Sequence, residues 1–213
     1  MKVAYVILIL VVGSVFAGLA IHQELVSSSL PLENLKGKTY SLVNGSIALY
    51  LNLNTTEISP GQAIHIIAMM YYRGNEPLII NSSYFSLPAP YPCAQSRPIG
   101  LNIFKGYYTE ANISKAEPLI LIAPGVYDCP NLFLATQYKL LPSSDSMQLI
   151  YQGKVVDTIP NEFSLNVSGY WIPNNSSTSI IPQGSFTTFQ PGIYTVQLLD
   201  YFNQSVLGYF TVT

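Results

Sequence analysis

Apolar residues are distributed along this chain in two ways, as one uninterrupted run near the start and as short alternating segments afterwards. The run covers residues 3–21, which carry no charge and follow Lys2. Nineteen residues in a helix reach roughly 28 Å, about the hydrocarbon thickness of a bilayer. The run also ends in small residues at Ala17 and Ala20, which suits a signal-peptidase site. Residues 1–22 are therefore predicted to be either a cleaved signal peptide or a retained transmembrane anchor, and in both cases the rest is exported.

Beyond this run, short alternating stretches predict strands, because Pro or Gly interrupts nearly every segment long enough for a helix. Residues 46–53 alternate with apolar side chains on one face, which predicts a half-buried strand. Residues 63–72 are apolar on both faces, so that strand needs cover on both sides. Short strands with turns about every 8 to 12 residues are typical of a β-sandwich. Further strands are expected at residues 78–80, 99–108, 119–122, 136–140, 147–151, 155–159, 163–170, 185–189, 193–200 and 205–213.

The last two of these strands form the clearest predicted hairpin. It opens with Pro191-Gly192 followed by Tyr194, which resembles the tyrosine corner of immunoglobulin-like domains, where a Tyr at the start of a late strand bonds back to the preceding turn. Val196 stands where antibody domains carry a cysteine, so the inter-sheet disulfide of those domains is absent. The expected fold is all-β, an Ig-like antiparallel β-sandwich preceded by an N-terminal apolar helix and a short arm.

Three segments follow from this pattern. Residues 1–22 are the signal peptide or anchor, residues 23–40 are an arm or linker, and residues 41–213 are the Ig-like sandwich. The arm differs from the rest because it contains a run of three serines, Pro31 and several of the chain's few charges. The excursion at 87–128 is too long for an ordinary loop and is expected to carry strands of its own.

Charge is scarce in this chain. Charged residues make up 9% and the net charge is -2, whereas an average soluble domain is about 25% charged. No basic field is present to hold a phosphate backbone, so nucleic acid is not expected as a partner. Neutral hydroxyl and amide hydrogen bonds do not titrate as ion pairs do, and this composition therefore suits acid or heat outside a cell.

Two features agree with export. Eight Asn-X-Ser/Thr sequons follow the apolar run, and glycans on them would solvate a surface that lacks charges. Cys93 and Cys129 lie in Pro-containing segments about 36 residues apart, and an oxidising exterior would join them in a disulfide. The alternative is a pair of free thiols. The sequon asparagines are Asn44, Asn54, Asn81, Asn112, Asn166, Asn174, Asn175 and Asn203.

The sequence contains no catalytic constellation, so we expect a non-enzymatic protein without a metal or an organic cofactor. Its two histidines are His22, beside the apolar run, and His65, which has apolar neighbours in a predicted strand. Such a pair supports neither a metal site nor a Ser-His-Asp triad. Glu110 and Glu117 are the nearest candidates for the two carboxylates of glycoside chemistry, but solvated surface glutamates are the simpler interpretation.

Aromatic pairs offer a second, weaker hypothesis of sugar binding. Trp171 with Tyr170, and the pairs Tyr71-Tyr72 and Tyr107-Tyr108, could form a sugar-stacking platform. Tyrosines of an all-β chain more often fill the edges and interfaces of a sandwich, which is the preferred reading.

The combination of an apolar export segment, a polar arm, dense sequons, a charge-poor sandwich and the final Pro-Gly-Ile-Tyr-Thr-Val-Gln-Leu hairpin resembles small cell-surface proteins of thermoacidophilic archaea. Within that group the chain looks most like the subunits of extracellular thread filaments. The resemblance implies donor-strand assembly, in which the N-terminal arm of one subunit fills a groove in the next. The arm here, roughly residues 21–35, carries Leu25, Leu30, Leu32 and Leu35, and serines and Pro31 interrupt its alternation.

Two classes of function remain open. The first is a structural subunit of a surface filament whose partner is itself, joined through the arm. The second is a monomeric domain, tethered to the membrane through residues 3–21 if they are not cleaved, that binds a ligand or serves a surface complex.

Overall fold

The computed structural model describes residues 37–81, 87–94, 96–129, 135–174 and 183–213. The chain divides into two units, Met1–Leu35 and Lys36–Thr213, and all described residues belong to the second. The predicted apolar helix, nearly all of the predicted arm and Asn175 lie outside the described residues. Within the described ranges, no helix has the length and apolar character needed to cross a membrane.

The described part is almost entirely β-structure, with one short 3-10 helix at Ile113–Lys115. Every strand pairing is antiparallel except the one between β3 and β14. The strands are β1 (Lys38–Asn44), β2 (Ile47–Leu53), β3 (Glu57–Ile58), β4 (Ile64–Tyr72), β5 (Leu78–Asn81), β6 (Ile99–Lys105), β7 (Gln137–Leu140), β8 (Ser146–Tyr151), β9 (Lys154–Pro160), β10 (Glu162–Val167), β11 (Gly169–Pro173), β12 (Gly184–Thr188), β13 (Gly192–Asp200) and β14 (Ser205–Val212).

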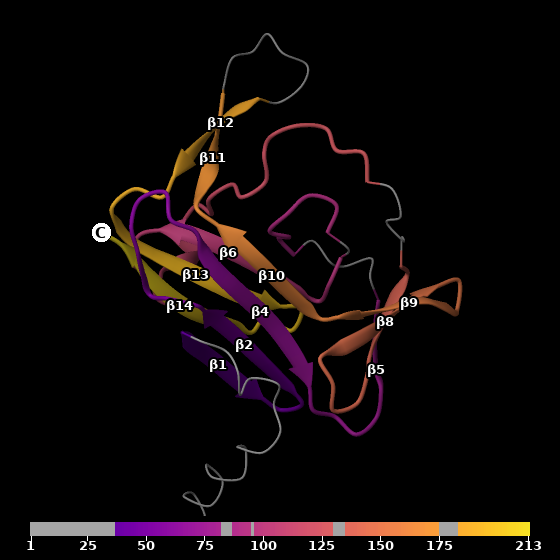
Figure 1. The fold of residues 1–213 in the computed structure, drawn as a ribbon. Coiled ribbons are helices and arrows are strands. Elements are labelled where there is room, and N and C mark those ends of the chain that lie inside the picture. Colours follow the sequence, from indigo (N-terminus) through magenta and orange to yellow (C-terminus); the bar gives the residue numbers. More distant parts are fainter. Residues whose placement is uncertain (1–36, 82–86, 95, 130–134, 175–182) are drawn as a thin grey trace, which may run out of the picture. The chain divides into compact units, whose positions relative to one another are not determined.

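Two four-stranded sheets form the main core. The first sheet has the order β1-β2-β4-β10 and the second has the order β3-β14-β13-β6 (Figure 1). They face each other through fully buried side chains such as Leu51 of β2, Ile66 of β4, Val196 of β13 and Phe210 of β14. Burial of this apolar surface is the main favourable term in folding. The prediction of a β-rich fold with antiparallel sheets is confirmed for the residues that the structure describes.

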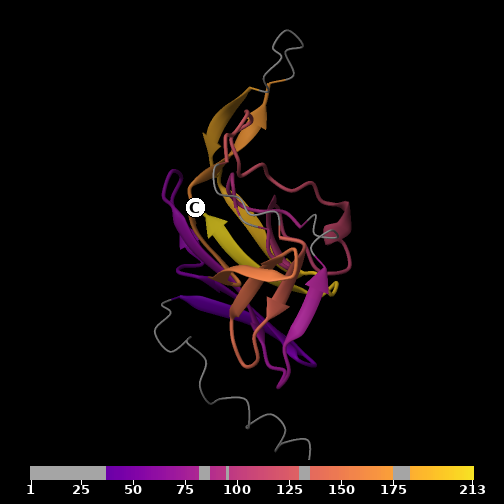
Figure 2. The same ribbon diagram turned by 90° about the vertical axis from the view of Figure 1, so that its right-hand side faces the viewer.

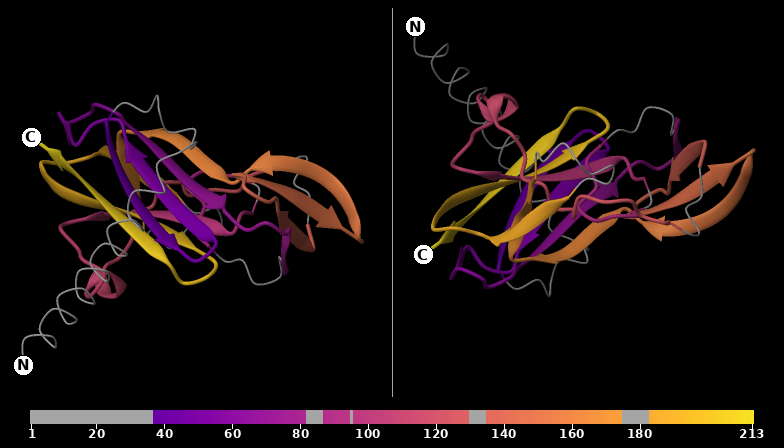
Figure 3. Two further views of the ribbon diagram at one scale, coloured as in Figure 1. Left: turned by 90° about the horizontal axis from the view of Figure 1, so that it is seen from below. Right: turned by 90° about the horizontal axis from the view of Figure 1, so that it is seen from above.

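Two smaller elements are added to these sheets. Strands β5, β7, β8 and β9 form a third four-stranded sheet, whose β8–β9 turn has positive φ at Gln152 and Gly153, as a two-residue hairpin turn requires. The β8–β9 hairpin reaches past the strands of the main sheets in both views of Figure 3. Strands β11 and β12 form a separate hairpin, which Figure 2 shows extending away from β13 and β14.

Four expectations from the sequence need correction. Strand β2 is buried on both faces rather than half-buried, because its outward Tyr50 lies beside Met69 of β4 and its outward Asn52 donates to the Thr39 hydroxyl of β1. The predicted strand at 119–122 is absent, since its backbone bonds go to two different strands, at Ile103 of β6 and Trp171 of β11.

The last two corrections concern boundaries. The predicted strand at 163–170 is split into two strands, β10 and β11. The predicted arm is shorter by three residues, because β1 begins at Lys38.

The split within 163–170 occurs at Gly169. A side chain there would collide with the backbone carbonyl of Thr187, so only glycine allows β12 to approach β11 this closely. The chain therefore leaves β4 after Val167 and pairs with β12 instead.

The expected tyrosine corner is present at the start of β13. The Tyr194 side chain is fully buried, and its hydroxyl donates to the Gln190 carbonyl at 2.9 Å while it accepts from the Gln190 N–H at 2.9 Å. The Tyr194 ring also stacks on Phe210 of β14, with centroids 5.0 Å apart and planes 8° apart. This tyrosine thus joins the turn before β13 to the core between the sheets.

We expect Tyr194→Phe to lower the free energy of unfolding by about 1 to 2 kcal/mol, because the ring still packs while two buried hydrogen bonds to Gln190 are lost. Denaturant unfolding of the purified protein measures this change. Tyr151→Phe is the control, since the Tyr151 side chain is 42% exposed and should leave stability within about 0.5 kcal/mol of the parent. Equal effects of the two substitutions would contradict the role of the corner.

Candidate functional site

The residues that could have carried catalysis are dispersed in the structure. His65 is half-buried on β4, and its Nδ1 lies 3.1 Å from Asn166 Oδ1 on the neighbouring strand β10. Glu110 and Glu117 are both exposed. Among the described residues, no group of three or more His, Cys, Asp or Glu side chains could hold a metal ion. The contact with Asn166 gives His65 a structural hydrogen-bond partner.

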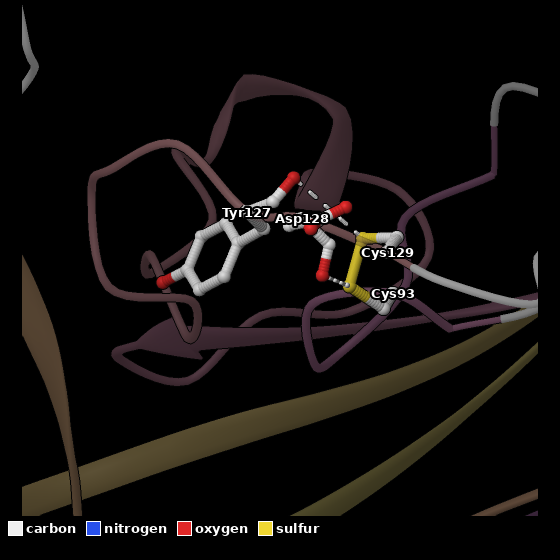
Figure 4. Close-up of a disulfide and its surroundings, with 4 residues drawn as sticks. All are labelled: Cys93, Tyr127, Asp128 and Cys129. Atoms are coloured by element: carbon white, nitrogen blue, oxygen red, sulfur yellow. Dashed lines mark hydrogen bonds between the residues drawn. A yellow bond between two sulfur atoms is a disulfide. The ribbon is translucent and has the colours of Figure 1, made fainter.

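The cysteine prediction is confirmed, because Cys93 and Cys129 form a disulfide with a Cα–Cα distance of 5.2 Å. Figure 4 shows the bond joining two loop segments beside Tyr127 and Asp128. Cys93 is exposed and Cys129 is half-buried, so the bond lies near the surface. It ties the segment before β6 to the segment that leads to β7 and thereby limits the freedom of the long excursion.

All sequon asparagines that the structure describes are exposed, namely Asn44, Asn54, Asn81, Asn112, Asn166, Asn174 and Asn203. Where hydrogen bonds are formed, they use the amide oxygen. Asn54 Oδ1 accepts from the His65 N–H at 2.8 Å, and Asn112 Oδ1 accepts from the Thr109 N–H at 2.7 Å. In these two residues the nitrogen that would carry a glycan faces away from the bond, so both sites suit modification.

The aromatic pairs predicted as sugar platforms have different environments. Tyr72 is buried, and its hydroxyl donates to the Glu76 carbonyl at 2.7 Å. Trp171 packs edge-to-face on Phe186 within the β11–β12 hairpin. Tyr107, in contrast, is 60% exposed and stacks on Tyr209 of β14 with centroids 4.9 Å apart. Of the three pairs, only the one containing Tyr107 presents a largely free ring.

A feature that the sequence did not reveal is an unpaired edge of β14. Strand β3 pairs with β14 only at Thr211 and Val212, so the strand from Ser205 to Phe210 has no described strand on that side. The N–H groups of Thr211 and Thr213 point to this side, since they donate to the carbonyls of Thr56 and Ile58. By the two-residue repeat of a strand, the N–H and C=O of Leu207 and Ser205 point the same way.

Tyr40 of β1 occupies the middle of this edge. The Tyr209 N–H donates to the Tyr40 hydroxyl at 3.3 Å, and that hydroxyl donates to the Tyr209 carbonyl at 3.4 Å. The Tyr40 ring can lie there because residue 208 is glycine, where a Cβ would come within 3.0 Å of the ring. The Tyr40 side chain thus takes the place of one residue of a partner strand, and within the described ranges Ser205 and Leu207 have no such substitute.

The unpaired part of β14 lines a hollow of about 480 Å³. One wall is Ser205, Leu207 and Tyr209 of β14, and the other is Ser41 and Leu42 of β1 together with the loop at 109–111. The opposite edge of the second sheet, at β6, is covered, because the Leu101 N–H donates to the Pro88 carbonyl and the Leu119 N–H donates to the Ile103 carbonyl. In the second sheet, the β14 edge is therefore the more open one.

A second hollow of about 510 Å³ lies on the far side of Tyr209. Tyr40, Tyr107 and Tyr209 supply its aromatic wall, while Lys38 and Glu57 supply charged groups at its rim. The Lys38 ammonium lies 4.9 Å from the centre of the Tyr40 ring, which is a cation–π contact. This hollow combines an exposed ring face with polar groups, and we call it the tyrosine hollow.

We expect the double variant Cys93→Ser, Cys129→Ser to have a free energy of unfolding about 3 to 4 kcal/mol lower than the parent. The reason is that closing a loop of this length lowers the conformational entropy of the unfolded chain by a corresponding amount. Denaturant midpoints of the oxidised parent and the variant measure the difference. The reduced parent is the control and should behave as the variant does. An unchanged midpoint would show that the bond adds no stability.

Neither a protein family nor a curated protein nor a solved structure significantly matches this chain. Its function has to be argued from its own residues and their geometry.

Proposed function

We propose that this protein is a non-enzymatic, glycosylated subunit of an extracellular surface filament, in which the N-terminal arm of one copy adds a strand to the β14 edge of the next. The observation that carries this proposal is the unpaired edge from Ser205 to Leu207 among the described residues, with a hollow beside it. Exposed edge strands are ready templates for another chain, and native proteins that do not use them protect them. Strand addition satisfies the free backbone groups and fills the hollow with side chains.

We infer an Ig-like architecture from the strand order. The chain leaves the first sheet after β2, adds the short β3 parallel to the last strand, and returns to the first sheet with β4. In an Ig-like domain, one of the two sheets contains the last two strands of the chain. The order β14-β13-β6 and the corner at Tyr194 agree with that sheet. The first sheet ends at β10 with no further strand among the described residues, so its described part differs from the seven-stranded form.

An extracellular location is supported by three independent features. The disulfide is of a kind that persists in oxidising compartments. The described sequon asparagines are exposed, and the apolar run at residues 3–21 predicts export. Glycans at the sequons would solvate a surface of 9% charged residues.

The arm suits the β14 edge in composition and size. Leu30 and Leu32 are two residues apart, so in a strand they point to the same side. The hollow presents Leu42 and Leu207 on its walls, and burial of leucines against them would contribute about 25 cal/mol per Å² of apolar surface. Such a contact is heterologous, with an arm on one copy and a groove on the other, so it propagates into a filament.

Leu207→Pro tests the edge directly. The Leu207 N–H points away from β13, so proline should leave the β13 ladder in place while it removes the donor that an added strand needs. We expect a folded protein by circular dichroism and cells without filaments by electron microscopy. Leu207→Thr is the matched control, because it shortens the same side chain but keeps the N–H, and filaments should persist.

Filaments of normal number and length from a folded Leu207→Pro protein would overturn the β14 edge as the acceptor. Deletion of residues 21–35 is a second test that leaves the sandwich untouched. A folded deletion variant that still forms filaments would overturn the arm as the donor.

The tyrosine hollow favours a second candidate, a membrane-tethered monomer that binds a sugar. Exposed tyrosine rings stack on the apolar faces of sugar rings, and Lys38 and Glu57 could bond to hydroxyl groups. An intact mass that retains residues 1–22 would favour this tethered form, since an anchor on every subunit obstructs polymerisation away from the membrane.

For this candidate, Tyr107→Ala should weaken binding in a glycan-array screen at least tenfold, because the free stacking face is removed. Tyr151→Ala removes a similarly exposed ring from the third sheet and should leave binding unchanged. If neither the parent protein nor Tyr151→Ala binds any glycan on the array, the sugar-binding candidate is excluded.

A further inference from the structure

The outer edge of β10 is a second place where the sandwich leaves backbone groups open. Within the described residues, β10 is the last strand of the first sheet, and β4 is its one partner in that sheet. The Asn161 carbonyl, just before β10, accepts from the Met70 N–H of β4 at 3.0 Å. Because the bonding direction alternates along an antiparallel strand, the N–H and C=O groups of Ser164 and Asn166 point away from β4.

An apolar hollow of about 310 Å³ lies beside this edge. It is lined by Leu165 and Val167 of β10 and by loop residues 90–92 and 121–123. Tyr127, whose side chain is 41% exposed, also lines it. The β10 edge thus offers what the β14 edge offers, open backbone groups next to a hollow that can take apolar side chains. An arm that adds to β14 could also add to β10 unless something prevents it.

Another edge of the described sheets carries the usual protection against an added strand. Strand β9, at the end of the third sheet, begins with Lys154 and ends with Pro160, and its pairing with β8 shifts register between Leu149 and Ile150. Lysine, proline and bulges are common at edges that must not pair. Strand β10 contains neither lysine nor proline, and its pairing with β4 is regular. A protected β10 edge therefore needs another device.

Strand β10 carries a sequon at Asn166-Val167-Ser168, and its asparagine lies inside the strand rather than in a turn. The Asn166 side chain is exposed, and its Oδ1 lies 3.1 Å from Nδ1 of His65 on β4. The amide oxygen is thus directed toward β4, so the nitrogen on the other side of Cγ is directed away from β4 and toward the open edge. Strand β14, in contrast, contains no asparagine.

We propose that an N-linked oligosaccharide on Asn166 covers the β10 edge and so restricts strand addition to β14. This inference rests on the proposed export, glycosylation and filament assembly. A bond forms between Nδ2 and the anomeric carbon of an oligosaccharide carried on a polyisoprenyl phosphate. The bond from that carbon to the phosphate oxygen breaks, and Nδ2 releases one proton as the carrier phosphate leaves. The amide orientation seen here suits this attachment, since the reverse would direct the sugar at the His65 ring.

Glycopeptide mass spectrometry of the mature protein gives the first test. We expect a glycan on Asn166 in most copies of the assembled protein. An unmodified Asn166 in filaments would overturn the shielding role, and it would leave the β14 edge and the filament proposal untouched.

Removal of the sequon gives the second test. Ser168→Ala abolishes the sequon but keeps Asn166 and its contact with His65. We expect electron micrographs to show a severalfold larger share of filaments in bundles or branches, because β10 then accepts strands. Ser46→Ala is the matched control, since it removes the sequon of Asn44 at the β1–β2 turn, and single filaments should persist. Single filaments alone from a folded Ser168→Ala protein would overturn the proposal.

A further substitution separates edge pairing from a general loss of solubility. Ser164→Pro removes an outward N–H of β10 and should leave the ladder to β4 in place. Combined with Ser168→Ala, it should restore single filaments. Bundles that persist in the double variant would show that they do not form through β10, which overturns the proposal. Asn166→Gln removes the same sequon and replaces Ser168→Ala if that variant does not fold.

The filament proposal and the shielding proposal can fail separately. If the parent protein forms no filaments, the filament proposal fails, and sedimentation of the purified full-length proteins decides the role of the glycan. Association of Ser168→Ala at concentrations where the glycosylated parent stays monomeric, reversed by Ser164→Pro, would support the shielding. Equal sedimentation of the parent and Ser168→Ala would overturn it.

Discussion

The apolar layer between the two four-stranded sheets is the interaction on which the other features depend. Its members come from strands far apart in the sequence, such as Leu51 of β2 and Phe210 of β14. Only 9% of the residues are charged, so ion pairs have little part in positioning these strands. Hydrophobic burial is not directional, and the positions of individual strands must be set by specific neutral contacts within and around the layer.

The tyrosines provide several of those contacts. Tyr194 ties the turn before β13 to the core through two bonds to Gln190, and Tyr40 reaches across to the backbone of Tyr209. In both cases the ring packs against apolar atoms while the hydroxyl satisfies backbone groups at an edge or a turn. Such bonds do not depend on pH below the tyrosine pKa, which agrees with the proposed location outside a cell.

Strand β14 belongs to both the core and the candidate site. Its inward residues belong to the core, and no strand of the described residues pairs with its outward backbone groups at Ser205 and Leu207. As far as the structure describes the chain, the edge is open because β3 is only two residues long. The length of a neighbouring strand, rather than any reactive side chain, therefore decides where this domain could accept another chain.

Periodicity and local motifs predicted much of this protein from the sequence by itself. Alternation identified most strands, Pro191-Gly192 and Tyr194 identified the corner, and the export context identified the Cys93–Cys129 bond, because each depends on residues close in sequence or on the only available partner. Tertiary structure alone decided that β2 is buried on both faces, that the segment at 119–122 forms no strand, and that the β14 edge is open. The burial of Asp200 at the end of β13 also required the fold. Burial and edge exposure depend on which strands become neighbours, and long-range pairing is not encoded in any local pattern.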